Sequence, residues 1–199
     1  MFWLIVLLGG AWLYVLSVLK RIGWSAAYVV LGVVGTFFII ISLANNNVIS
    51  FLMRLNTSGA GVVGMLTGFY TVAPTLGIIH IVSGQSAINL FITYECSALI
   101  ELAAYIALVL FFPFFKNLQQ RLKLLGFGVI YLLLANMLRL TVTALIIHFL
   151  GLPSLIWAHV IVGRLIFYVL TIILYFYVFT RSQVLHIKIG RFDFKTGGA

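Results

Sequence analysis

The sequence contains very little charge and almost no cysteine. Only 8% of its 199 residues are charged, whereas 64% are apolar. Soluble domains have about a quarter of their residues charged, so this composition excludes an ordinary soluble domain. The single cysteine, Cys96, excludes an intrachain disulfide. Acidic residues are equally scarce, since the chain has only Glu95, Glu101 and Asp193.

Long apolar runs make up most of the chain. Each is long enough to cross a hydrocarbon core of about 30 Å as a helix. The runs are continuous and do not alternate with polar residues, which favours helices over a membrane barrel. We therefore expect an all-α integral membrane protein, a bundle of about five to seven transmembrane helices that forms one domain over residues 1–199. The first run has no cleavage site after it, so we expect it to be retained.

The hydropathy pattern divides the chain into segments. Predicted helices cover residues 2–19, 24–43, 95–113, 124–149 and 154–180, and a basic loop is predicted at residues 116–123. Residues 48–70 are apolar but interrupted by polar residues, which indicates an interfacial helix followed by a partly inserted one. Residues 77–93 fit either a short extracytoplasmic hairpin or a poorly patterned membrane helix.

Basic residues give the chain a net charge of +9. They gather at Lys20 and Arg21, at residues 116–123 and in the tail at residues 181–199. Basic clusters between membrane helices face the cytoplasm, so we interpret them as topology signals in contact with the lipid bilayer. We expect no nucleic-acid partner. The tail is then cytoplasmic, and Cys96 lies at the extracytoplasmic face of a multi-pass protein of the cell membrane.

Two polar positions lie at the same predicted depth as the cysteine. Arg139 is 16 residues beyond Lys123, which places it about 24 Å along its helix. It shares a helix face with Asn136 and Thr143, and such a polar stripe must face the bundle interior. His159 lies near the outer start of the last helix. His148, near the outer end of the Arg139 helix, is the competing imidazole.

A Cys, an Arg and a His at one membrane face predict nucleophilic catalysis. Positive charge near Cys96 lowers a thiol pKa, and the thiolate is the reactive form. His159 could transfer protons, and Arg139 could stabilise an oxyanion. Glu101 is expected either to support this site or to pair with Arg164 as a structural bridge. The histidines and the cysteine show no metal-ligand spacing, so no metal and no cofactor are expected.

These residues resemble the motifs of the exosortase/archaeosortase family of membrane cysteine transpeptidases. The family pattern appears here as Cys96-Ser97-Ala98, Asn136-Met137-Leu138-Arg139, and His159 followed by Gly163. The likeness covers residues 60–180 and is greatest to the short type G exosortases of Gram-positive bacteria. One departure is Ala98, where the family has glycine.

The resemblance implies a protease or transpeptidase that acts on secreted proteins. Its partner would be a substrate with a C-terminal motif, a transmembrane helix and a basic tail. Cys96 would form a thioester with it and transfer it to a cell-surface acceptor, with Arg139 and His159 as further catalytic residues and Ser97, Asn136 and Gly163 in support.

A non-enzymatic alternative remains open. Glu101, Arg139 and Arg164 could form a buried charge network in a small transporter or an assembly factor. Separately, Asn56-Thr57-Ser58 matches the N-glycosylation pattern, which we interpret as a chance match.

Overall fold

Most of the chain forms helices that are long and apolar enough to cross a membrane. A computed structural model describes residues 2–83, 86–113, 115 and 117–180. Within them, four helical stretches have the length and composition of membrane spans: Ser25–Leu43, Asn46–Thr67, Leu118–Leu150 and Leu152–Thr180. The expected helical membrane bundle is therefore confirmed. The predicted tail at residues 181–199 lies outside the described residues.

The helices and strands follow one another in this order: α1 (Phe2–Ile22), α2 (Ser25–Leu43), α3 (Asn46–Thr67), β1 (Tyr70–Ala73), β2 (Ile78–Ser83), β3 (Ser86–Phe91), the 3-10 turn η1 (Tyr94–Cys96), α4 (Leu99–Phe111), α5 (Leu118–Leu150), the 3-10 turn η2 (Leu152–Ser154), the π-helix η3 (Trp157–Val162), α6 (Gly163–Tyr175) and the π-helix η4 (Phe176–Thr180).

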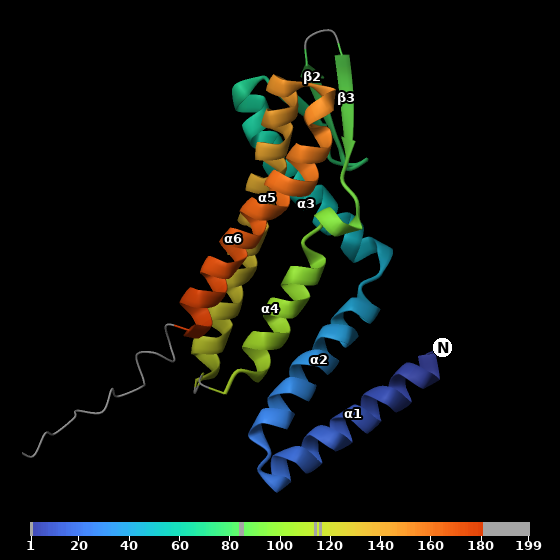
Figure 1. Cartoon of the computed structure of the whole chain (residues 1–199). Helices are drawn as coiled ribbons and strands as arrows, with labels where there is room; N and C mark the ends of the chain where they lie inside the picture. The colour runs from blue at the N-terminus through green and yellow to red at the C-terminus, as the bar shows by residue number, and fades with distance from the viewer. Residues whose placement is uncertain (1, 84–85, 114, 116, 181–199) are drawn as a thin grey trace, which may run out of the picture.

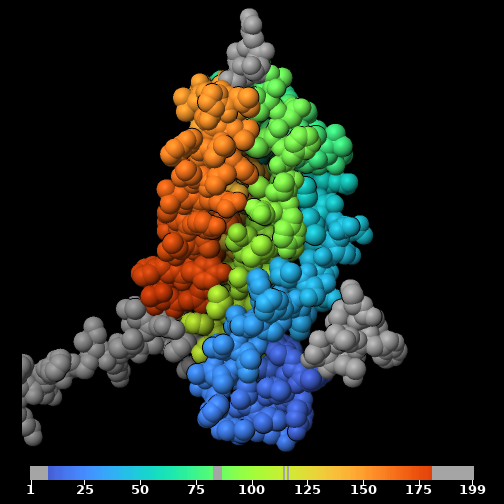
Figure 2. Space-filling model, turned by 45° about the vertical axis from the view of Figure 1, so that its right-hand side comes forward, coloured from blue at the N-terminus to red at the C-terminus, as the bar shows by residue number. Residues whose placement is uncertain are grey.

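The bundle has two levels along its length (Figure 1). α2 and α4 pack together in the lower level, and α3 and the sheet occupy the upper one. α5 runs through both levels and contacts α3, α4 and α6. α1 packs against α2, and the two form the lower end of the molecule in Figure 2.

The three strands form one antiparallel sheet with the order β1-β2-β3. Its side chains alternate, so that Ile79, Ile88 and Leu90 are buried while Asn89 and Phe91 are exposed. This alternation is typical of a sheet that covers a core with one face only. The hairpin expected between residues 77 and 93 is therefore present as β2 and β3, and β1 is an additional strand.

Two apolar clusters fill the bundle and adjoin at the Cys96 turn. The lower cluster includes Tyr105, Leu132 and Phe167, and it also contains Ala98. Cys96 belongs to the upper cluster, which is built on the sheet and on the second half of α5. The turn between β3 and α4 thus lies where the two clusters adjoin.

The structure corrects several predicted boundaries. Residues 46–67 form the single helix α3, whose N-cap Asn45 accepts a hydrogen bond from the Val48 amide at 3.0 Å. α5 begins at Leu118, so Arg121 and Lys123 lie within the helix and not in the predicted basic loop. The helix predicted from residue 95 begins at Leu99, because the preceding residues form η1.

Candidate active site

Cys96 lies in a tight turn between the sheet and α4. Thr93 continues the extended backbone of β3, with φ −91° and ψ 174°, and its carbonyl accepts a hydrogen bond from the Cys96 amide at 2.9 Å. Ser97 closes the turn, since its hydroxyl donates to the Tyr94 carbonyl at 2.7 Å. Ala98 then adopts a left-handed conformation, with φ 62°, before α4 begins. This geometry buries Cys96 to 1% exposure.

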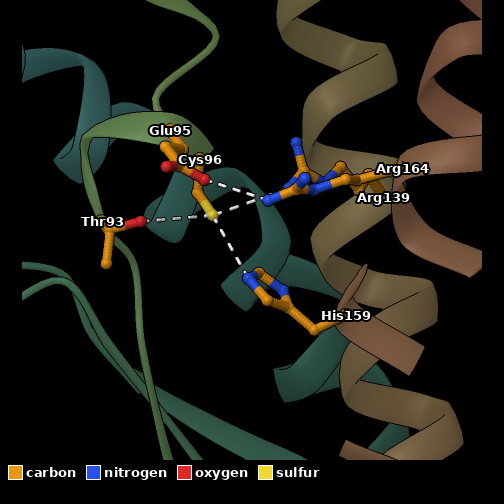
Figure 3. Close-up of polar contacts among 6 residues, drawn as sticks. All are labelled: Thr93, Glu95, Cys96, Arg139, His159 and Arg164. Atoms are coloured by element: carbon orange, nitrogen blue, oxygen red, sulfur yellow. Dashed lines mark hydrogen bonds and ion pairs between the residues drawn. The ribbon is translucent and has the colours of Figure 1, made fainter. Parts of the chain in front are cut away.

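Three side chains converge on the sulfur of Cys96 (Figure 3). The Arg139 guanidinium donates a hydrogen bond from Nη2 to Sγ at 3.7 Å. Nε2 of His159 lies 3.7 Å from the same atom. The Thr93 hydroxyl donates to Sγ at 3.8 Å. The structure therefore brings together the Cys, Arg and His that the sequence placed at one depth, and adds a hydroxyl that the sequence did not indicate.

Arg139 reaches the sulfur from the buried face of α5. Its side chain is 4% exposed, and its guanidinium carbon lies 5.8 Å from the ring centre of Phe167. Among the described residues, Nε of Arg139 has no hydrogen-bond partner. Thr143, one turn further along the same face, donates its hydroxyl to the Arg139 carbonyl at 2.9 Å. The polar stripe predicted on this helix thus faces the bundle interior.

His159 is carried by the π-helix η3. Such π-helical turns are rare and often occur at functional sites. Gly163 follows η3 and packs against α5, where a Cβ would lie 2.7 Å from Oγ1 of Thr143 and 3.4 Å from Cγ of Arg139. A glycine at this position therefore permits the close approach of η3 to α5 that brings His159 to Cys96.

Two carboxamides bind the backbone of the cysteine turn. Asn136 Nδ2 donates to the Cys96 carbonyl at 2.8 Å, and Asn56 Nδ2 donates to the Ser97 carbonyl at 3.1 Å. Both asparagines are fully buried. The sequence pattern predicted a supporting role for Asn136 on α5, whereas Asn56 on α3 was interpreted only as part of a chance glycosylation match. No local pattern marks Asn56, because its partner is 41 residues away.

The surroundings of Cys96 favour its thiolate. Burial raises the pKa of the thiol, but the His159 hydrogen bond, the Arg139 charge and the Thr93 hydroxyl all lower it, and the net shift is downward. Hydrogen bonds and positive charge stabilise the ionised form of a thiol, and a lowered thiol pKa is typical of reactive cysteines.

Glu95, next to the cysteine, is paired with a cation. Its Oε2 lies 3.0 Å from Nη2 of Arg164 (Figure 3). Both side chains are open to solvent, with 69% of Glu95 and 41% of Arg164 exposed. The expected bridge between Arg164 and Glu101 is therefore wrong, since Arg164 pairs with Glu95. The pairing also offsets the repulsion that Glu95 would exert on a neighbouring thiolate.

Other candidate residues lie apart from the sulfur. Nδ1 of His148 lies 2.6 Å from the Val82 carbonyl, and the ring stacks on Phe69, so this imidazole is engaged elsewhere. Within the described part of the chain, no hydrogen bond or ion pair joins Glu101 to Cys96, and no group of three His, Cys, Asp or Glu side chains could hold a metal ion.

Comparison of the chain with protein-family models, with curated proteins and with solved structures gave no match. Functional conclusions therefore depend on the geometry of the site.

Proposed function

We propose that this protein is a membrane-embedded cysteine protease or transpeptidase. The observation that carries the proposal is the buried Cys96 thiol with Arg139, His159 and Thr93 around its sulfur. A nucleophile with a base and a cation in contact is the arrangement required for acyl transfer. The resemblance of these residues to the exosortase motifs favours the same chemistry.

The position of the thiol along the bundle supports an extracytoplasmic site. Arg121 donates to the Leu110 and Phe115 carbonyls at one end of α4, and Arg139 contacts Cys96 just before the other end. Arg139 is 18 residues beyond Arg121, which is about 27 Å along the helix and close to the hydrocarbon thickness of a bilayer. Arg121 and Lys123 mark the cytoplasmic end by the positive-inside rule, so the thiol belongs at the outer face.

The proposed reaction proceeds in two acyl transfers. Cys96 first gives its thiol proton to His159. The resulting thiolate attacks a peptide carbonyl of a secreted protein, which forms the S–C bond and places negative charge on the carbonyl oxygen beside Arg139. His159 donates a proton to the leaving amine as the C–N bond breaks, and a thioester remains. An incoming amine then gives its proton to His159, attacks the thioester and displaces the thiolate. Water in place of the amine gives simple proteolysis.

The substrate proposed by resemblance is a secreted protein with a C-terminal motif, a membrane helix and a basic tail. A helix of this kind would place the preceding motif at the outer membrane surface, at the proposed level of Cys96. The contacts of the described residues do not support the alternative transporter network, because Arg139 faces the sulfur and Arg164 pairs with the exposed Glu95.

The test is a processing assay in the native host. Secreted proteins of the host that carry such a C-terminal helix are followed by their change in mass. We expect the variants Cys96→Ala, Arg139→Ala and His159→Ala to lose processing while they reach the membrane at wild-type levels. His80→Ala is the matched control, because this imidazole contacts Asn89 and not the sulfur. Full processing by Cys96→Ala would disprove the proposal.

A further inference from the structure

Thr93 lies beside the sulfur on the side opposite Arg139 (Figure 3). It is the residue that joins β3 to η1, and its backbone carbonyl accepts the Cys96 amide hydrogen at 2.9 Å. The same turn directs its hydroxyl to Sγ at 3.8 Å. Thr93 therefore contacts the cysteine through both its backbone and its side chain.

Exposure distinguishes Thr93 from the other two side chains at the sulfur. Arg139 is 4% exposed and His159 is partly buried, whereas Thr93 is exposed. Cys96 itself is almost fully buried. Thr93 is therefore the most exposed of the three residues around the sulfur, and we expect a peptide carbonyl that comes from solvent to meet it first.

We propose that Thr93 is a further catalytic residue, whose hydroxyl donates first to the Cys96 thiolate and then to the oxyanion of the tetrahedral intermediate. As the S–C bond forms, the negative charge moves from sulfur to the carbonyl oxygen. The sulfur then becomes a poor acceptor, which frees the hydroxyl hydrogen for the new anion. The oxyanion step rests on the proposed function, whereas the contact with the thiolate does not.

The thiolate contact is tested without any substrate. Cys96 is the only cysteine of the chain, so the rate of iodoacetamide alkylation of the purified protein against pH reports this thiol alone. Thr93→Val keeps the shape and the β-branch but loses the hydroxyl, and Thr93→Ser keeps the hydroxyl. We expect Thr93→Val to raise the midpoint pH of alkylation by about half a unit to one unit, and Thr93→Ser to retain the wild-type midpoint.

The oxyanion step is tested in the processing assay. Loss of one oxyanion donor lowers kcat by about 100-fold or more, and we expect Thr93→Val to lower kcat with little change in KM. A wild-type midpoint for Thr93→Val in alkylation, or a wild-type kcat in processing, would overturn the proposal. Failure of the proposed function itself has a different signature, because Cys96→Ala would then process normally while the alkylation midpoint of Thr93→Val would still shift.

A separate observation concerns the backbone of the same turn. Asn56 and Asn136 donate to the consecutive carbonyls of Ser97 and Cys96 from two different helices. The residue that follows these carbonyls, Ala98, has the left-handed backbone that only glycine adopts without strain. We infer that Asn56 is a positioning residue, which fixes the Ser97 carbonyl and thereby the direction of the Cys96 side chain.

A neighbour on α3 provides the control for Asn56. Thr57 is equally buried, but its hydroxyl donates only within the helix, to the Met53 carbonyl at 2.7 Å. We expect Asn56→Leu to raise the alkylation midpoint of Cys96, because the sulfur moves away from its donors, and Thr57→Val to leave it unchanged. Asn56→Ala gives the same measurement if the leucine variant does not fold. An unchanged midpoint for the folded Asn56 variant, or an equal shift in Thr57→Val, would contradict this role.

Discussion

Ala98 allows a prediction in which one kind of substitution has different effects at two buried sites. Ala98 has φ 62° and is 2% exposed, whereas Ala103 is fully buried within α4. A left-handed backbone costs a residue with a Cβ about 1–2 kcal/mol, and replacement by glycine removes that strain. In the interior of a right-handed helix, the same replacement costs about 1 kcal/mol.

The two variants share their other contributions. Each loses one methyl group, whose burial stabilises the fold by about 0.8 kcal/mol. Each also adds freedom to the unfolded chain, which costs about 1 kcal/mol and accounts for most of the cost within the helix. Ala98→Gly should therefore change the free energy of unfolding by less than about 1 kcal/mol, and Ala103→Gly should lower it by about 2 kcal/mol. The expected difference in the free energy of unfolding is about 1–2 kcal/mol, because only the strain at Ala98 remains once the shared contributions cancel.

The assay is equilibrium unfolding in mixed micelles, with helix content followed as SDS is added. Ala98→Gly and Ala103→Gly are compared with the wild type under identical conditions. Equal losses of stability in the two variants would refute the reasoning, because they would mean that Ala98 is not strained. The comparison concerns the turn only, so its outcome is independent of the proposed activity.

Three further predictions concern the site. Because the pKa of Cys96 is lowered, the folded protein should be alkylated at its full rate above this lowered pKa and should lose reactivity as the pH falls through it. In SDS-denatured protein, the midpoint pH of the alkylation rate should therefore be higher. Gly163→Ala should destabilise the protein by about 1–3 kcal/mol and slow the alkylation of Cys96, because the new Cβ would clash with α5. Gly126→Ala is the control and should have neither effect, because no atom lies within 4 Å of a Cβ at that position. Glu95→Gln should change the free energy of unfolding by less than about 1 kcal/mol, because its ion pair is exposed; a larger loss would contradict that reading.

Hydropathy predicted the bundle where helices are uniformly apolar. Hydropathy did not predict α3 as a single helix, because polar residues interrupt its apolar run. Only some of these polar residues face outward, since Asn56 and Thr57 are buried against other elements. β1 was missed because it has only four residues. Such a short strand exists through its pairing with β2, which the local sequence does not encode.

The site was predictable in part from depth alone. Counting residues along two helices placed Arg139 and His159 level with Cys96, and the structure joins them through the sulfur. Thr93 and Asn56 could not be found in this way. Thr93 reaches the sulfur because of the shape of the turn, and Asn56 on α3 binds the carbonyl of a residue in that turn 41 positions away.

The π-helix η3 explains why Arg164 was assigned the wrong partner. An α-helix turns 100° per residue, so in a regular α-helix Arg164, five residues beyond His159, would point about 140° away from it. In a π-helix the backbone bonds i to i+5, and here the Gly163 amide donates to the Ala158 carbonyl. Residues five apart are therefore brought toward a common side. His159 can then contact Cys96 while Arg164 pairs with Glu95, the residue before it. The wider turn thus lets one helix contact two adjacent residues of the cysteine turn, which a regular α-helix with the same spacing would not.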